Sequence, residues 1–252
     1  MNREREDQNK ISETGFQETA DIDTASDDYA SRFAGITGQY FLDVQSRITL
    51  DLLKDLPNVS VLDVGGGHAQ LAVPLVKAGY NVTVTGSDQT TNVRLRRLLE
   101  KGTYQHQVCD CLHLPFADNQ FEVVMAFRLL PHVTQWQRLL SEMCRVAGKA
   151  VILDYPDRRS ANILYDILFD LKKKMEGNTR SFLLFSRHEI TQEFIRNNFN
   201  KPVFRPEFFA PMVLHRKMKI PAFSKFLEAV FYYVGLTNIF GSPIIIRSNK
   251  RR

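Results

Sequence analysis

Residues 61–70 read VLDVGGGHAQ, and this stretch constrains the fold of the chain more than any other. A short apolar run ends in three consecutive glycines, which is typical of a buried strand that turns sharply into a helix. Gly65 and Gly67 allow backbone angles and close approaches that a Cβ atom would prevent. The helix that follows offers free N–H groups and the positive end of its dipole, which suit a carboxylate. The pattern therefore predicts a βα unit that binds a small ligand at its turn.

Strand and helix patterns alternate through the middle of the chain. Short apolar or β-branched runs predict strands, and the segments between them have the apolar spacing of helices. The expected strands are 59–64, 81–86, 104–109, 122–127 and 150–154, and the expected helices are 71–78, 91–101 and 134–146. Strands that alternate with helices of this length predict a doubly wound, parallel α/β sheet.

The two ends of the chain differ from this core. Residues 1–26 are polar and poor in aromatic residues, so we expect a disordered or loosely attached lead-in. The next segment has helical spacing, and Gly35 and Gly38 divide it into a short and a longer helix. Ser186 and Glu189 form a capping box, which predicts the start of a later helix. The C-terminal third is expected to contain helices over 160–176, 187–198 and 221–235, an extended segment over 202–214 and a last strand over 242–247.

Composition points to a protein of the cytoplasm with an uneven charge. The first ten residues lack the apolar segment of a secretion signal, and no apolar run reaches the roughly 18 residues of a membrane-spanning helix. The three cysteines have no metal-binding spacing, so we expect reduced thiols and no metal site. Residues 157–252 hold 18 Lys/Arg against 8 Asp/Glu, whereas residues 1–30 hold 3 against 9. The basic third could meet anionic lipid, nucleic acid or an acidic substrate, or it could simply be a solvated surface.

Three acidic residues follow three successive predicted strands. Asp63 precedes the glycine turn and can attract an ammonium group, so the turn suits an amino acid, and S-adenosylmethionine has such an end. Asp88, 23 residues after Gly65, is placed to accept hydrogen bonds from the hydroxyls of a ribose. Asp110 can accept one from the amine of adenine. Ligands of such sheets bind at the carboxyl ends of the strands, where these acids meet.

A dinucleotide-binding site fits the turn less well. The dinucleotide fingerprint needs a glycine or alanine where this chain has Gln70, and a larger side chain there obstructs the packing of helix on strand. Asp63 within the turn would also repel a pyrophosphate. The sequence therefore favours S-adenosylmethionine over a nicotinamide or flavin cofactor.

Two stretches resemble class I S-adenosylmethionine-dependent methyltransferases. Residues 61–69 resemble the first motif of that family, D/E-x-G-x-G-x-G, with Ala69 replacing the last glycine. Residues 109–121 (CDCLHLPFADNQF) are similar to the D-x-x-x-L-P-F-x-D-x-x-F-D stretch of its ubiquinone/menaquinone-biosynthesis-like branch (methyltransferase type 11/25). Glu122 stands where that branch usually has Asp. The similarity continues through LPHV at 130–133 and SEMCRV at 141–146, and it spans roughly residues 59–156.

The resemblance implies a fold and a division of the chain. The expected fold is a doubly wound, mostly parallel seven-stranded sheet (a Rossmann-like methyltransferase fold) with an N-terminal helical lid and C-terminal helical additions. After a lead-in over residues 1–26, the methyltransferase domain is expected over residues 27–252. Within it we expect the lid over 27–57, the cofactor-binding core over 58–156, and acceptor-side elements with the last strands over 157–252.

The resemblance also implies a set of cofactor-binding residues. The ten positions expected to contact S-adenosylmethionine are Asp63, Gly65, Gly66, Gly67, Asp88, Gln89, Asp110, Cys111, Arg128 and Leu129. Arg128 departs from the family, which more usually has a small or polar residue at that position. A cation beside a sulfonium needs a carboxylate partner, for example that of the cofactor itself.

Three residues are candidate bases for the transfer step. Oxygen acceptors benefit from a general base, and activated carbon acceptors must lose a proton after methylation. His132 follows the fourth predicted strand, Tyr155 follows the fifth, and His215 lies in a basic stretch. The chain lacks the N/D-P-P-Y/F tetrapeptide of enzymes that methylate exocyclic amines. We therefore expect methyl transfer to oxygen or carbon of a small, apolar or aromatic metabolite.

The aromatic C-terminal region leaves several partners open. Its aromatic and sulfur-containing residues are Phe208, Phe209, Met212, Phe223, Phe226, Phe231, Tyr232 and Tyr233. They can form core, an acceptor pocket, or a peripheral membrane contact beside Lys217, Lys219 and Lys225. The alternatives to a small-molecule enzyme are an RNA or protein methyltransferase that uses the basic face, and a non-catalytic cofactor-binding module. No DNA-binding module is evident, and the sequence does not indicate an oligomeric state.

Overall fold

The structure is a computed structural model, and it describes residues 15–160, 182–210 and 221–251. Its strands are β1 (Ser60–Val64), β2 (Asn81–Gly86), β3 (Tyr104–Val108), β4 (Phe121–Ala126), β5 (Ala147–Tyr155), β6 (Val203–Pro206) and β7 (Ile244–Asn249). Its helices are α1 (Ala20–Thr24), α2 (Asp27–Ser31), α3 (Gly35–Leu53), α4 (Ala72–Lys77), α5 (Val93–Leu98), α6 (Trp136–Val146), α8 (Arg187–Arg196), α10 (Pro221–Tyr233) and α11 (Leu236–Phe240). Three short 3-10 turns are η1 (Gly66–His68), η2 (Gln89–Asn92) and η3 (Leu130–His132).

The seven strands form one sheet in the order β3-β2-β1-β4-β5-β7-β6. β1 pairs in parallel with β2 and β4, and β7 lies antiparallel between β5 and β6. The order of the strands reverses between β1 and β4, so this is the point at which a sheet of this kind opens a ligand-binding crevice. The predicted mostly parallel, doubly wound seven-stranded fold is confirmed.

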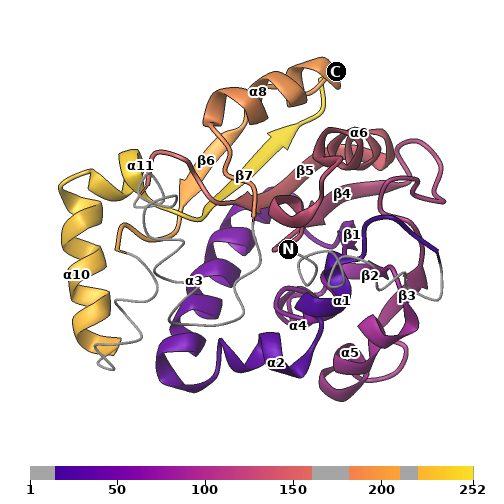
Figure 1. Ribbon diagram of the computed structural model, residues 1–252, viewed down its shortest axis with the longest axis horizontal. Helices are drawn as coiled ribbons and strands as arrows, with labels where there is room; N and C mark the ends of the chain where they lie inside the picture. Colours follow the sequence, from indigo (N-terminus) through magenta and orange to yellow (C-terminus); the bar gives the residue numbers. More distant parts are fainter. Residues whose placement is uncertain (1–14, 161–181, 211–220, 252) are drawn as a thin grey trace, which may run out of the picture.

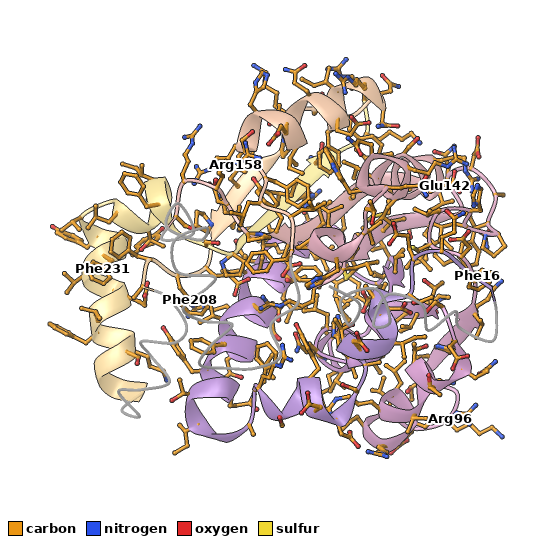
Figure 2. The ribbon with its side chains drawn as sticks, viewed as in Figure 1. Phe16, Arg96, Glu142, Arg158, Phe208 and Phe231 are labelled. Atoms are coloured by element: carbon orange, nitrogen blue, oxygen red, sulfur yellow. The ribbon has the colours of Figure 1, made fainter. Side chains whose placement is uncertain are left out.

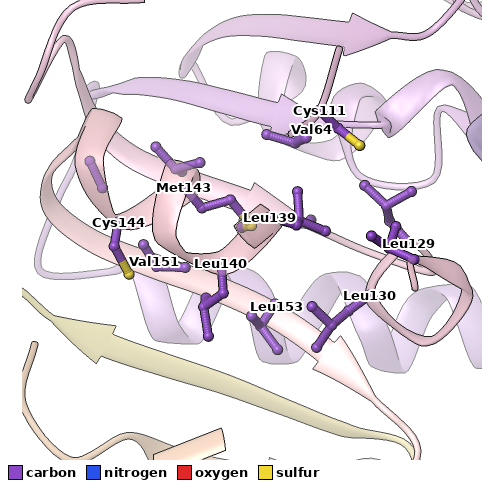
Figure 3. Close-up of a cluster of buried hydrophobic side chains, with 14 of the residues drawn as sticks. Val64, Cys111, Leu129, Leu130, Leu139, Leu140, Met143, Cys144, Val151 and Leu153 are labelled. Carbon is purple, nitrogen blue, oxygen red and sulfur yellow. The ribbon is translucent and has the colours of Figure 1, made fainter. Parts of the chain in front are cut away.

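Helices cover both faces of the sheet (Figure 1). Because side chains alternate along a strand, β1 sends Leu62 and Val64 to one face and Val61 and Asp63 to the other. The first face packs against α6 and α8, and part of its buried cluster is drawn in Figure 3. The second face packs against α3, α4 and α5. Asp63 is thus a carboxylate on an otherwise apolar face.

The capping box is confirmed at the start of α8. The Ser186 side chain accepts from the Glu189 N–H, and the Glu189 side chain accepts from the Ser186 N–H. The helix expected over residues 160–176 lies outside the described residues. The extended segment expected over 202–214 is shorter in its described part, where β6 ends at Pro206.

The N-terminal boundary differs from the prediction. The lead-in expected over residues 1–26 already has ordered structure from residue 15, and α1 and the cap of α2 lie within it. The two glycines that follow have different roles: Gly35 begins α3 with a φ of +75°, whereas Gly38 lies inside this helix. A Cβ on Gly38 would meet the Phe33 backbone at 2.2 Å, so Gly38 permits close packing of the preceding turn.

Candidate cofactor and acceptor site

The glycine turn wraps around the carboxylate of Asp63. Gly65 has a φ of +70°, in the left-handed region that favours glycine. A Cβ on Gly66 would lie 2.1 Å from Asp63 Oδ2. A Cβ on Gly67 would lie 2.6 Å from the carbonyl oxygen of Thr91. A side chain at any of these three positions would be strained or would clash, and the absence of one at Gly66 makes room for the Asp63 carboxylate.

Asp63 is a buried carboxylate without compensation among the described residues. Its side chain is fully buried, and neither carboxylate oxygen has a hydrogen-bond partner within the part of the chain that the structure describes. Burial first, and the neighbouring Asp154 second, raise the pKa of Asp63 to about 7. A charged carboxylate in such a place calls for a cation with N–H donors. An ammonium group fits that requirement.

His68 fastens the turn to the end of β4. Its Nδ1 accepts from the Gln70 N–H at 3.1 Å, so the ring proton is on Nε2, which donates to the Phe127 carbonyl oxygen at 3.1 Å. Burial lowers the pKa of His68 to about 4, and the ring is therefore neutral at physiological pH. The sequence motif contains His68 but did not indicate this role, because Phe127 lies 59 residues away.

Asp88 and Asp110 lie at the ends of β2 and β3, as predicted. Asp88 is partly exposed, and its Oδ1 accepts from the N–H and the hydroxyl of Thr90 at 2.8 and 2.7 Å. These hydrogen bonds hold the pKa of Asp88 below its usual value. Asp110 accepts from the Leu112 N–H at 2.9 Å and lies 2.9 Å from Nδ1 of His113. Both acids therefore cap local turns in addition to any contact with a ligand.

The remaining cofactor positions lie around this edge of the sheet. Cys111 is buried and unpaired with any other cysteine, and burial raises the pKa of its thiol. Gln89 is exposed in η2. Leu129 is buried, and its Cδ2 lies 2.9 Å from the position of a Cβ on Gly65. Leu129 therefore closes the turn from the β4 side.

Arg128 is paired within the protein. It has a φ of +58°, which is uncommon for arginine. The backbone N–H of Arg128 donates to Asp154 Oδ1 at 2.7 Å, and its side-chain Nε lies 3.4 Å from Asp154 Oδ2. The guanidinium group lies over the Phe33 ring, 5.6 Å from the ring centroid. The sequence left the carboxylate partner of Arg128 open and offered the cofactor's own as an example. The structure assigns this role to Asp154.

A third buried acid, Glu207, faces the same centre and was not predicted from the sequence. Neither of its carboxylate oxygens has a hydrogen-bond partner among the described residues. Burial raises its pKa to about 8, with attraction to Arg128 lowering it and repulsion by Asp154 raising it. Asp154 and Glu207 thus both attract the Arg128 guanidinium, and Asp154 also repels the carboxylate of Asp63. No local pattern could have revealed Glu207, because Arg128 is distant in sequence.

The N-terminal segment is fastened across this edge of the sheet. Glu18 accepts from the N–H groups of Thr134 and Gln135 at 2.8 and 3.2 Å. Asp21 accepts from the N–H and the hydroxyl of Ser87, both at 2.6 Å. Further along, Asp27 forms an ion pair with Arg97 at 2.8 Å. These three contacts correct the expectation of a loosely attached lead-in, at least from residue 15 onward.

Helix α1 lies directly over the glycine turn (Figure 1). The Asp21 Cβ lies 3.4 Å from the position of a Cβ on Gly65, and the Ala25 Cβ lies 3.0 Å from that of Gly67. Ala20 is buried with the core residues beneath it. The space over the turn, where a ligand held by Asp63 would continue, is therefore filled by α1. A neighbouring pocket of about 360 Å³ extends from His68 beneath α2.

The three candidate bases have different surroundings. His132 lies in η3 after β4, is half-buried, and donates its backbone N–H to Leu129 at 2.9 Å. Tyr155 is fully buried, and its ring contacts Phe185 edge-to-face at 6.0 Å. Burial also raises the pKa of Tyr155, which disfavours a phenolate. His215 lies outside the described residues.

The chain is similar to known methyltransferases. Residues 62–152 match the family model of the methyltransferase domain. The chain is 31% identical over 140 residues to the ubiquinone/menaquinone biosynthesis C-methyltransferase UbiE of Cupriavidus pinatubonensis, covering 50% of this chain and 58% of that protein. It is 30% identical over 173 residues to the UbiE protein of Ectopseudomonas mendocina, covering 61% of this chain and 67% of that one.

Solved structures show the same fold at low identity. Magnesium protoporphyrin IX methyltransferase from Synechocystis PCC 6803, with bound SAH, has a TM-score of 0.59 at 14% identity and covers 91% of this chain and 97% of that chain. The [4+2]-cyclase SpnF has a TM-score of 0.54 at 19% identity, over 81% of this chain and 80% of that chain. Such similarity establishes the fold alone.

The fold is that of a doubly wound α/β protein, a class in which ligands bind at the carboxyl edge of the sheet. The chain belongs to the class I S-adenosylmethionine-dependent methyltransferases, in the branch that contains the UbiE proteins. It spans between about half and two thirds of the length of the curated relatives named above. No helix among the described residues is long and apolar enough to cross a membrane.

The raised pKa of Asp63 predicts how stability depends on pH. An acid whose pKa rises on folding stabilises the protein fully below its usual pKa, near 3.8, and this stabilisation is lost as the pH rises through about 7. One pKa unit corresponds to about 1.4 kcal/mol. We therefore expect Asp63→Asn to become more stable than the wild type by a few kcal/mol between pH 5 and pH 8 in urea denaturation without cofactor.

The matched control is Asp88→Asn. The pKa of Asp88 is lowered rather than raised. The difference in stability between Asp88→Asn and the wild type should therefore not grow above pH 5. Parallel stability curves for the wild type and Asp63→Asn across this range would show that Asp63 is not an uncompensated buried acid.

Proposed function

We propose that the protein binds S-adenosylmethionine and transfers its methyl group to oxygen or carbon of a small, apolar or aromatic acceptor. The observation that carries this proposal is the buried carboxylate of Asp63 beneath the glycine turn. The ammonium group of the cofactor supplies the cation and the N–H donors that this carboxylate lacks among the described residues. Membership of the methyltransferase family supports the same cofactor.

The remaining outline of the cofactor follows the edge of the sheet. The methionine end would lie against Asp63 and residues 65–67, and the ribose would lie at Asp88 and Gln89. Adenine would lie between Asp110 and Cys111. The order of the strands supports this order of cofactor parts, because β1, β2 and β3 lie side by side in the sheet and each carries one of the acids at or after its end.

The protein's contribution to the transfer is mainly alignment. S-adenosylmethionine supplies an electrophilic methyl group with a built-in leaving group, so the site has to orient the acceptor and exclude water. Leu129 and α1 keep water from the turn. The ion pair of Arg128 with Asp154 leaves Arg128 less positive toward a sulfonium than an unpaired arginine would be.

The nature of the acceptor rests on chemistry and on relatives. His132, in η3 after β4, would lie beside the methyl group and is our candidate for holding the proton that the acceptor loses. The similar UbiE proteins are named C-methyltransferases of ubiquinone/menaquinone biosynthesis, which supports a carbon acceptor in an apolar molecule.

We further infer that residues 16–34 act as a lid that moves when the cofactor enters. Asp21 and Ala25 lie over Gly65 and Gly67, within the space that the methionine end requires. A few hydrogen bonds and ion pairs hold the lid in place. Among them, the N–H and the hydroxyl of Ser87 both donate to the Asp21 carboxylate, directly over the glycine turn. Lid segments of this kind exclude water from a site after closure.

Loss of the Asp88 carboxylate should weaken cofactor binding. We expect Asp88→Ala to reduce the affinity for S-adenosylmethionine at least tenfold, about 1.4 kcal/mol, in isothermal titration calorimetry. Thr90→Ala is the matched control, because it removes the hydroxyl contact with Asp88 and leaves the carboxylate. Absence of binding by the wild type would contradict the proposed function, and unchanged affinity in a folded Asp88→Ala would contradict the position of the ribose.

Release of the lid should accelerate cofactor binding. Asp21→Ala removes both hydrogen bonds to Ser87, so a larger fraction of the free protein is open and the association rate should rise about threefold or more. Stopped-flow fluorescence can follow this step, because the single tryptophan, Trp136, directly follows Gln135, which is bonded to Glu18.

The control for the lid is Asp28→Ala, which removes an exposed acid from the same segment and should leave the rate unchanged. Slower or weaker binding by Asp21→Ala would mean that Asp21 holds the cofactor instead of closing the site.

A further inference from the structure

Helices α10 and α11 form a hairpin at one end of the molecule, beyond β6 (Figure 1). The inner side of α10 carries both apolar and polar groups. Phe231 contacts Phe209, with ring centroids 4.4 Å apart. Glu228 is buried and accepts from the N–H groups of Phe209 and Ala210 at 2.8 and 2.9 Å, and Ser224 is also buried. Lys225 lies over the Tyr40 ring of α3 at 5.5 Å. The hairpin is thus attached to the body through these polar and charged groups as well as through the contact of Phe231 with Phe209.

The outer side of α10 is apolar. Phe226, Val230 and Tyr233 follow one another at helical spacing, and Tyr233 is 92% exposed. Figure 2 shows side chains of α10 that project away from the body of the protein. We define the α10–α11 patch as the exposed residues Phe226, Val230, Tyr232, Tyr233, Val234, Ile239 and Phe240.

The exposed side of α10 differs from that of an ordinary surface helix. A helix on a globular protein normally buries its apolar side and exposes its polar side. Here Ser224 and Glu228 are buried while Phe226 and Tyr233 are exposed. Contiguous exposed apolar side chains of this kind mark a contact surface, and aromatic side chains are those preferred at the interface between water and lipid.

The charge of the sequence that contains the patch favours one kind of contact surface. Between Phe208 and Phe240 the sequence contains a single acid, Glu228, and this acid is buried and hydrogen-bonded. The same stretch contains four bases: Arg216, Lys217, Lys219 and Lys225. A cationic segment next to exposed aromatic residues matches an anionic bilayer, where each basic residue near the surface adds attraction.

We propose that the α10–α11 patch docks on an anionic lipid bilayer. The aromatic and aliphatic side chains enter the interfacial region, and the excess of basic charge in this part of the sequence adds attraction to the anionic head groups. The surface is distinct from the cofactor site, so docking does not depend on methyl transfer. Docking would bring the protein to acceptors that are dissolved in the membrane.

Sedimentation with vesicles tests the proposal on the full chain. We expect the wild type to bind vesicles of phosphatidylcholine and phosphatidylglycerol in about equal parts, and to bind phosphatidylcholine alone much less. Phe226→Gln/Tyr233→Gln should reduce binding to the mixed vesicles at least tenfold. The matched control is Ile36→Gln/Leu98→Gln, which removes two exposed apolar side chains from other helices and should bind as the wild type does.

Two further measurements make the outcome decisive. Thermal unfolding should show that Phe226→Gln/Tyr233→Gln is as stable as the wild type, since both side chains are largely exposed. Size-exclusion chromatography should show the same mass for both. No binding to mixed vesicles by the wild type, or equal binding by the patch variant, would overturn the proposal. If the wild type does not bind vesicles but forms a dimer, and the patch variant is a monomer, the patch is instead a contact with a second copy of the chain.

Discussion

The buried carboxylate of Asp63 is the constraint on which the rest of the site depends. A carboxylate in the interior is stable only with a partner. Among the described residues, the charged group that shifts the pKa of Asp63 is another acid, Asp154. Asp154 is balanced by Arg128, which leaves Asp63 to be balanced by a ligand. The glycine turn then follows from geometry, because any side chain on Gly66 would occupy the position of the Asp63 carboxylate.

The sequence predicted the parts of the molecule that local patterns encode. The alternation of apolar runs predicted the strands from β1 to β5, and the order of the sheet confirms the doubly wound fold. Spacing placed Asp63, Asp88 and Asp110 at three successive strand ends, because one strand-end acid per βα unit is a local feature. The capping box at Ser186 was likewise readable from four consecutive residues.

The parts that could not be predicted depend on contacts between distant residues. Asp21 reads as one acid in a polar lead-in, and only its bonds to Ser87, 66 residues away, make it part of the site. Glu207 follows a short edge strand and gives no sign that Arg128 lies near it. The environment of Tyr155 also required the structure, because a tyrosine at the end of a strand can line a pocket or, as here, lie in the core.

Two different surfaces follow from the same architecture. The carboxyl edge of β1 to β3 carries the proposed cofactor-binding groups beneath α1, and the α10–α11 patch lies at the other end of the sheet, beyond β6. The [4+2]-cyclase SpnF shares this fold, so the fold alone does not establish methyl transfer. The carboxylate of Asp63, unpaired among the described residues, supports binding of the cofactor on which methyl transfer depends.

Proton release on cofactor binding tests that chemistry most directly. At pH 6.5 the amino group of S-adenosylmethionine is charged, since α-amino groups have a pKa of about 7.7–8.0. Asp63, with a pKa of about 7, is mostly protonated in the free protein at this pH. Calorimetry in buffers of different ionisation enthalpy should show that the wild type releases a proton on binding and that Asp63→Asn does not. Equal proton release by both proteins, or none by the wild type, would contradict the pairing of Asp63 with the ammonium group.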